Sequence, residues 1–327
     1  MRTNLLAVRV CGVAAAVMLP LFAAAAPANY PSKPIRLIAA NSAGGGLDVV
    51  ARAVSPKLAA VFGYQVVVDN RPGAAGSIAS EITAQAPPDG HTLLVSSLGG
   101  LAVNTNLYKG LRYHPLRDLT PVTFATSQSN VVVVNQSVAA KSVQELIALS
   151  RAQPGKLTYG SSGAGNAGHL AVELFKTITK TDMVHVPYKG GAPAMIDLIA
   201  GQVQLVFSSA PTAVPQVRAG KVRALAVTTL RRSAALPELP TLAESGLPGY
   251  EADNWYGIAT TAGTPRNIID YLNAEFGRAL LAPDVKQLLL TQGLEVRTST
   301  PAEFGAYMKS EFDKWAKVIK DAGLTAN

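Results

Sequence analysis

The sequence predicts an α/β protein of two domains with a cleft between them. Short β-rich runs alternate along the chain with segments of helical periodicity, which is typical of parallel strands joined by crossover helices. The same order of strand, glycine turn and helix also occurs twice, in residues 35–97 and 157–209. At 327 residues the chain is long enough to bury a core in each of two domains.

The amino end has the features of a signal peptide over residues 1–26. Two arginines precede an apolar run from Val10 to Phe22, and alanines 23–26 supply a small-residue cleavage region. The run is shorter than the ~20 residues that a membrane-spanning helix needs. The single cysteine, Cys11, lies inside it, so we expect an exported chain without a thiol or a disulfide.

Positive charges outnumber negative ones, with 29 Lys and Arg residues against 21 Asp and Glu residues. The charges are scattered rather than gathered into a stripe, and a pair such as Arg231-Arg232 is too short to follow a phosphate backbone. We therefore expect no nucleic-acid partner, whereas the positive field favours anionic ligands.

The first repeat begins with the β-rich run Ile35–Ala39 and the glycine turn Ser42–Gly46. Apolar residues then recur at helical spacing from Leu47 to Val61 and predict a helix with one apolar face. The rest of the repeat is expected to hold a strand at 65–68, a turn at 71–76, a helix to about residue 86 and a strand at 92–95.

The second repeat follows the same plan. A strand at 157–159 meets the glycine turn Gly160–Gly165, and apolar residues from Ala171 to Ile178 mark one helix face. It continues with a strand at 183–186, a turn at 187–191, a helix at 192–200 and a strand at 204–207. Both repeats end on a serine pair, Ser96-Ser97 and Ser208-Ser209.

Two links are expected to join the domains. Leu119–Ala125 is predicted as an outgoing strand before the run Val131–Val134, and Glu251–Thr261 as a returning one. A double crossover of this kind permits hinge closure. Helices with a proline near each start are expected at 268–281, 284–292 and 302–322. The predicted division is domain 1 from 27–125 with 252–327, and domain 2 from 126–251.

Each glycine turn follows the first strand of its repeat, at the carboxyl end of that strand. Open α/β sheets bind ligands at such ends. The helices that follow expose unpaired backbone N–H groups and the positive end of the helix dipole, so two opposed turns make a cleft suited to an anion. Either turn alone is equally typical of a compact chain reversal, and the matching positions of both favour a binding site.

Ordered motifs extend over essentially the whole mature length. They are Gly44–Arg52, Val67–Gly76, Pro88–Leu93, Tyr159–Gly165 with His169-Leu170, Val186–Gly190 with Pro193-Ala194 and Asp197-Leu198, and Pro301, Glu303-Phe304 and Trp315–Ile319. Together they resemble the tripartite tricarboxylate transporter solute-binding proteins, also called the Bug family.

The resemblance implies a periplasmic binding-protein fold of type II, in which each domain is a mixed sheet flanked by helices and the cleft lies between the domains. It implies capture of a small organic carboxylate without chemistry, and delivery to the integral membrane permease of a tripartite tricarboxylate transporter. A monomer in the periplasm, with no cofactor and no metal, is expected.

In the family, one ligand carboxylate is held between the two glycine turns, largely by main-chain N–H groups. By position, the residues expected there are Ala43, Gly44, Gly45, Asp48, Ser161, Ser162, Gly163 and Gly165. The chain departs from the family at Asn41-Ser42-Ala43, where relatives carry a proline and an aromatic, so the floor of the pocket is expected to be wider or more polar.

Further ligand contacts are expected at the predicted strand ends and links. The candidates for the far end of the ligand are Ser97, Tyr188, Ser208, Asp253 and Trp255, of which Tyr188 and Trp255 equally fit packing roles. His169 is expected to orient the second glycine turn. Asp197 is predicted as a helix cap or an interdomain bond. The particular carboxylate stays open.

Three catalytic or cofactor hypotheses are weaker. Gly163–Gly168 matches the dinucleotide pattern G-x-G-x-x-G with Asp182 beyond it, but export removes the chain from the nicotinamide pool. His169 and Glu173 lie four residues apart without a second histidine to complete a metal site. Ser161 and Ser162 lack the nucleophile elbow, which disfavours an exported hydrolase. A binding protein that feeds a sensor kinase stays an open possibility.

Overall fold

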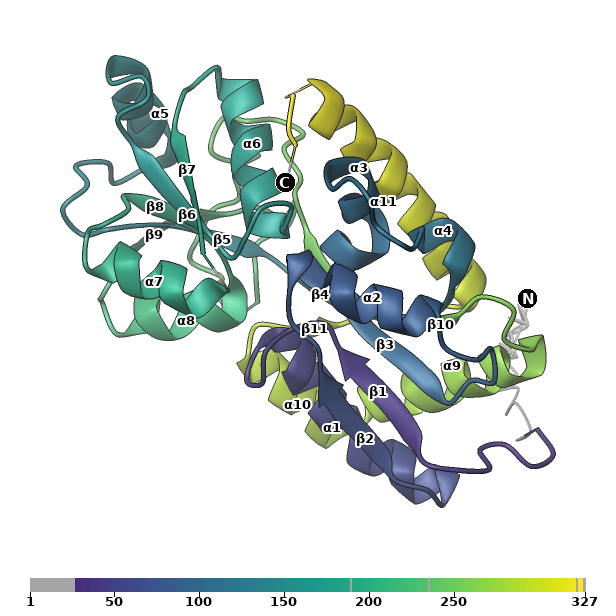
Figure 1. The fold of residues 1–327 in the computed structure, drawn as a ribbon. Coiled ribbons are helices and arrows are strands. Elements are labelled where there is room, and N and C mark those ends of the chain that lie inside the picture. Colours follow the sequence, from purple (N-terminus) through teal and green to yellow (C-terminus); the bar gives the residue numbers. More distant parts are fainter. Residues whose placement is uncertain (1–26, 189, 235, 322, 326–327) are drawn as a thin grey trace, which may run out of the picture.

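The computed structural model describes residues 27–188, 190–234, 236–321 and 323–325 (Figure 1). The predicted signal peptide and Cys11 lie outside the described residues. In the described part of the chain, none of the helices combines the length and the apolar character needed to cross a membrane. Figure 1 shows two sheets with helices on their faces, which we call the first and the second lobe.

The first lobe contains a six-stranded sheet, counted over the described residues, in the order β11-β4-β10-β3-β1-β2. β1 pairs in parallel with β2 and β3, whereas β10 runs antiparallel to β3 and β4. The bounds are β1 Ile35–Ala39, β2 Val66–Asn70, β3 Thr92–Ser97, β4 Leu119–Gln128, β10 Asn254–Thr261 and β11 Glu295–Val296.

The second lobe contains a five-stranded sheet, over the same described ranges, in the order β7-β6-β8-β5-β9. β6 pairs in parallel with β7 and β8, and β5 runs antiparallel to β8 and β9. The bounds are β5 Asn130–Val134, β6 Thr158–Ser161, β7 Val184–Pro187, β8 Leu205–Ser209 and β9 Arg223–Val227. Both sheets are mixed, which confirms the predicted fold class.

The two lobes repeat one plan. The order β10-β3-β1-β2 of the first sheet corresponds to β5-β8-β6-β7 of the second. β1 and β6 are equivalent, and each is the central one of three parallel strands. Each central strand leads through a glycine loop into a helix and then into its parallel neighbour. The duplication expected from the sequence is therefore confirmed, and it places both glycine loops at equivalent strand ends.

Helices cover the sheets as the alternation of elements predicts. The first lobe carries α1 Gly46–Phe62, η1 Ala74–Gly76, α2 Ser77–Ala84, η2 Gly99–Val103, α3 Asn104–Leu107, α4 Pro115–Asp118, α9 Arg266–Leu281, α10 Pro283–Thr291 and α11 Pro301–Asp321. The second lobe carries α5 Val143–Ala152, α6 Ala167–Thr179, α7 Gly191–Ile199 and α8 Ala210–Arg218. Trp255 of β10 is fully buried against Phe304 of α11, with ring centroids 5.7 Å apart, which confirms its packing role.

The chain crosses between the lobes at two adjacent places. It passes from β4 to β5 through Ser129 and returns from β9 to β10 through residues 228–253. The Thr228 hydroxyl accepts a hydrogen bond from the backbone N–H of Asn130 at 3.0 Å and donates to the carbonyl of Ala252 at 3.0 Å. The two crossings are thus tied to each other at the hinge. The exact domain boundaries at 125/126 and 251/252 stay predictions.

Candidate ligand-binding site

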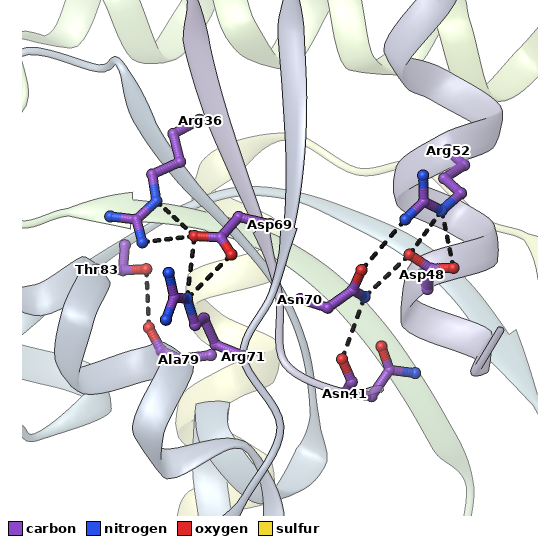
Figure 2. Close-up of polar contacts among 9 residues, drawn as sticks. All are labelled: Arg36, Asn41, Asp48, Arg52, Asp69, Asn70, Arg71, Ala79 and Thr83. Carbon is purple, nitrogen blue, oxygen red and sulfur yellow. Dashed lines mark hydrogen bonds and ion pairs between the residues drawn. The ribbon is translucent and has the colours of Figure 1, made fainter. Parts of the chain in front are cut away.

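The first glycine loop, Ser42–Gly46, connects β1 to α1 and is organised by Asp48 (Figure 2). Asp48 is 3% exposed, and its carboxylate accepts the Gly44 N–H at 2.8 Å and the Arg52 Nε–H at 2.9 Å. The Asn70 side chain donates to the same carboxylate at 2.9 Å. Burial raises the pKa of Asp48, but the hydrogen bonds from Arg52, Gly44 and Asn70 outweigh it and hold the pKa below its ordinary value.

Glycines in this loop leave room for neighbouring side chains. A Cβ at Gly45 would overlap the amide group of Asn41, and a Cβ at Gly46 would lie 2.5 Å from the Tyr256 hydroxyl. Asn41 therefore packs against the loop with its Oδ1 buried and without a partner among the described residues. Asn41 is the first residue of the departure from the family, and a wider or more polar pocket floor at this place stays a prediction.

The amino end of α1 carries no capping side chain from the described residues, because its N-cap residue is Gly45. A helix of 17 residues has a dipole equivalent to about half a positive charge at this end. Asp48, the acidic residue of the first turn, is neutralised by the Arg52 ion pair. The loop and helix end therefore offer backbone donors to an anion.

The second glycine loop, Ser161–Gly165, connects β6 to α6 and is held from within its own lobe. The Gly163 N–H donates to the Ser161 hydroxyl at 3.2 Å, and the Gly165 N–H donates to His169 Nδ1 at 3.1 Å. Asn166 caps α6 by accepting the His169 N–H at 3.1 Å. The amides of Gly44, Gly163 and Gly165 are thus committed inside the protein, and these glycines set the shape of the loops.

Three stacked aromatic rings, those of Tyr159, His185 and His169, pack beside the second loop. The rings of His169 and His185 have centroids 4.1 Å apart, and Tyr159 stacks on His185 at 4.8 Å. His185 Nε2 lies 2.7 Å from the Ser161 hydroxyl. Burial is the largest cause that lowers the pKa of both histidines to about 4. The second cause is the charge of Lys176 for His169 and the charge of His169 for His185. His169 thus orients the loop as a neutral acceptor, in the role predicted for it.

The second loop also touches the first lobe directly. The Tyr108 hydroxyl, at the end of α3, donates to the carbonyl of Ala164 at 2.8 Å. A Cβ at Gly165 would overlap the end of the Leu107 side chain of α3, and the φ of +80° at Gly165 also favours glycine. The two lobes are therefore in direct contact at the second loop and α3.

The residues expected at the far end of the ligand are not gathered in one place. Ser97 ends β3 half-buried, while the Ser208 side chain is buried and Tyr188 donates to Asp197 at 2.7 Å. Asp253 lies by the hinge and lines a cavity of about 460 Å³. Burial, with the Glu251 charge second, raises the pKa of Asp253 to about 7.

Asp197 takes neither role predicted for it. It lies inside α7 rather than at its end, and its partner Tyr188 belongs to the same lobe. The expectation of a cap or an interdomain bond is therefore wrong, because the turn before α7 brings Tyr188 back over the helix.

Neither a metal site nor a hydrolase site is formed by the residues that could have supplied one. The Glu173 carboxylate bonds Tyr159 and Lys176 rather than facing a metal with His169, and the described residues hold no cluster of three metal-ligating side chains. Ser161 and His185 form a serine–histidine contact that the sequence did not reveal. The Ser161 side chain is 1% exposed and lies beneath its loop, where a substrate carbonyl has no access.

Several residues that shape the site escaped prediction. Tyr108, His185, Asn70 and Tyr256 are far in sequence from the glycine turns that they support. Had the pairing of β2 with β1 been predicted from the sequence, Asn70 would have been identified as a neighbour of the first loop. Asn70 is the last residue of β2 and lies opposite Ala39, the last residue of β1.

Comparison with known proteins supplies the family. A family model described as "Tripartite tricarboxylate transporter family receptor" matches residues 50–324. Protein BugT of Bordetella pertussis is 35% identical over 296 residues, which cover 90% of this chain and 91% of that protein.

Two solved structures match at the level of the fold and the sequence. A protein from R. palustris with adipate has a TM-score of 0.85 at 36% identity, covering 91% of this chain and 99% of the other. MatC from Rhodopseudomonas palustris with bound malate has a TM-score of 0.82 at 30% identity, covering 89% of this chain and 100% of the other.

Two mixed lobes, a double crossing and paired glycine loops define a two-lobed solute-binding protein. The chain belongs to the tripartite tricarboxylate transporter receptor family, a periplasmic family that includes the Bug proteins. The family and the matched structures are solute-binding proteins, so this chain binds a solute and is not an enzyme.

Proposed function

We propose that this protein captures a small organic carboxylate between the loops Ser42–Gly46 and Ser161–Gly165 and delivers it to the membrane permease of a tripartite tricarboxylate transporter. The main observation that supports this proposal is the pair of glycine loops, which follow the equivalent strands β1 and β6. A pair of such loops, one of them leading into an uncapped helix, supplies donors from both lobes to one anion.

The chemistry of the cleft agrees with a carboxylate ligand. The acidic side chain nearest the first loop, Asp48, is already paired, and relatives of this chain were solved with adipate and with malate. A charge-assisted hydrogen bond contributes about 1.5–3 kcal/mol, while association costs at least about 4 kcal/mol, so the rest of the ligand must add contacts.

The proposed site keeps the residues expected from the sequence but divides their roles. Ala43, Ser162 and the first turn of α1 face the ligand, while Gly44, Gly45, Gly163, Gly165, Asp48, Ser161 and His169 shape the loops. Contacts of Ser97, Ser208 and Tyr188 with the rest of the ligand stay predictions, and Asp253 lines the hinge cavity. The mature chain acts as a periplasmic monomer after removal of residues 1–26.

Calorimetry and thermal-shift measurements on the mature chain, residues 27–327, test the capture. A panel of mono-, di- and aromatic carboxylates is expected to contain at least one that raises the melting temperature and binds without turnover. Amides of the same acids serve as controls and should not bind. Binding of the amides with equal affinity would overturn the anion site, and ester hydrolysis abolished by Ser162→Ala would restore the hydrolase hypothesis.

Uptake measurements separate transport from sensing. Deleting this chain or a permease of the tripartite type is expected to abolish uptake of the same radiolabelled acid. Uptake that persists without this chain, together with loss of ligand-induced transcription, would favour the sensor kinase partner.

A further inference from the structure

Asn104, the first residue of α3, lies between the turn that precedes α2 and the second glycine loop. Its side chain is buried, and the residue is 1% exposed. The amide nitrogen Nδ2 donates to the carbonyls of Ala74 and Ala75, each at 3.1 Å, and to the Ser77 hydroxyl at 2.8 Å. Because carbonyl oxygens only accept, these partners fix Nδ2 on their side and Oδ1 on the other.

Asn104 Oδ1 is a buried acceptor that no donor among the described residues satisfies. A Cβ at Gly165 would lie 3.6 Å from this oxygen and a Cβ at Gly99 3.3 Å from it, so Oδ1 lies between Gly99 of its own lobe and the second glycine loop of the other. The next two residues, Thr105 and Asn106, also each bury a polar atom without a partner within the described chain. Native proteins satisfy most buried polar atoms, so this segment calls for an additional hydrogen-bonding group.

The location of this acceptor restricts what approaches it. The proposed carboxylate lies at the loop that contains Gly165, and a carboxylate oxygen beside Oδ1 would place two acceptors together. A hydroxyl or an ammonium group on the carbon next to the carboxylate would instead bring a donor to Oδ1.

We propose that Asn104 selects carboxylates that carry a hydrogen-bond donor on carbon 2, namely 2-hydroxy or 2-amino acids. This inference rests on the proposed function, because it requires the carboxylate to be held by the second glycine loop. Removal of the donor from such a ligand leaves Oδ1 buried and unpaired in the closed complex, which weakens binding.

Three four-carbon dicarboxylates form a matched probe set: succinate has no donor on carbon 2, malate has a hydroxyl and aspartate an ammonium group. Calorimetry on the mature chain is expected to give at least about tenfold tighter binding for malate or aspartate than for succinate. The pair lactate and propionate, and the pair 2-hydroxyadipate and adipate, repeat the comparison at other chain lengths.

Substitutions test whether Asn104 Oδ1 causes the preference for ligands with a donor on carbon 2. In Asn104→Leu the preference is expected to fall below about twofold, because Oδ1 is gone. Ser77→Ala is the matched control, since it removes one partner of Nδ2 but keeps Oδ1, and its preference should match the wild type. If Asn104→Leu does not fold, Asn104→Ala is the second variant, which also removes Oδ1, and its preference should likewise fall below about twofold.

Each outcome decides the inference. Equal affinity within every pair in the wild type would overturn it and assign Oδ1 to a bound water. A preference that survives in folded Asn104→Leu would also overturn it. Binding of no carboxylate at any chain length would instead overturn the proposed function, which keeps the two failures distinguishable.

Discussion

Both oxygens of the Asp48 carboxylate are committed to groups of the protein itself, namely the Gly44 amide, Arg52 and Asn70. Asp48 thus holds the Gly44 main-chain N–H in place, while a direct contact of Asp48 with the ligand stays a prediction. Asp69, the neighbour of Asn70 on β2, instead accepts hydrogen bonds from Arg36 of β1 and from Arg71, which follows β2 (Figure 2).

Asp48→Ala tests the anchoring role. The change is expected to lower the free energy of unfolding by about 2–3 kcal/mol, because it removes hydrogen bonds to a buried charged group. It should also weaken carboxylate binding at least tenfold by freeing the first loop. Asp69→Ala is the control, with a loss of about 1 kcal/mol or less and unchanged affinity. Urea unfolding and calorimetry measure both, and unchanged affinity in Asp48→Ala would contradict the role.

The depressed pKa values of His169 and His185 predict how stability depends on pH. In the unfolded chain these histidines gain protons near pH 6.5, whereas in the folded protein they do so near pH 4. Below pH 6.5 the unfolded state therefore binds more protons, and the free energy of unfolding falls as pH drops toward 4.

Urea unfolding between pH 4 and 7.5 checks this dependence. His169→Gln, which keeps an acceptor for the Gly165 N–H, should make the decline shallower, and adding His185→Gln should make it shallower still. Equal slopes for the wild type and the double variant would show that the stacked histidines do not control it.

At the scale of elements, the glycine loops behave differently although they occupy equivalent places. Gly165 has a φ of +80° and faces Leu107 of the opposite lobe, while the first loop packs on Asn41 and Tyr256 of its own lobe. The second loop is thus the one that contacts the opposite lobe.

Gly165→Ala is expected to reduce ligand affinity at least tenfold, because its Cβ would overlap Leu107 and hold the lobes apart. Its positive φ also costs stability, by about 1–2 kcal/mol. Gly63→Ala is the matched control, with a φ of +68° and open space around it, so it should lose similar stability and no affinity. Comparable affinity in the two variants would contradict the steric explanation.

The elements differ in how far the sequence foretells them. β1 is predicted at its observed bounds, and α1 and α9 within two residues, because apolar periodicity and glycine or proline ends mark them clearly. η2 and α3 were missed, since Gly99 and Gly100 break the helical pattern there. A Cβ at Gly100 would lie 2.5 Å from Ser96 Oγ, so tertiary packing selects those glycines. Asn104, and with it the proposed donor selectivity, was hidden for the same reason.

At the scale of the whole molecule, two kinds of contact join the lobes. The crossings are tied at Thr228, and the Tyr108 hydroxyl of the first lobe bonds the second loop of the other lobe. The equivalence of the lobes was predictable from the repeated motifs. The contact of Tyr108 with Ala164 was not, because it depends on how the lobes close.

Tyr108→Phe tests the latch between the lobes. Loss of one hydrogen bond of about 1 kcal/mol is expected to weaken every ligand by roughly fivefold, with faster release and no change in ligand preference. Tyr30→Phe removes a hydroxyl that bonds the Gly90 carbonyl within the first lobe, so it should change stability but not affinity. Calorimetry and small-angle scattering of the free form measure the effect, and identical affinities in wild type and Tyr108→Phe would contradict it.

The adjacency of the two crossings also bears on the lobes as building blocks. The Asn130 side chain donates to the carbonyl of Ala252, so the two ends of the segment between them lie side by side. The second lobe is therefore an insertion in the chain of the first lobe. A short turn that joins these two residues would make the second lobe a separate unit. A different inserted domain with the same spacing between its ends would fit the same first lobe, which would keep its glycine loop and the dipole of α1.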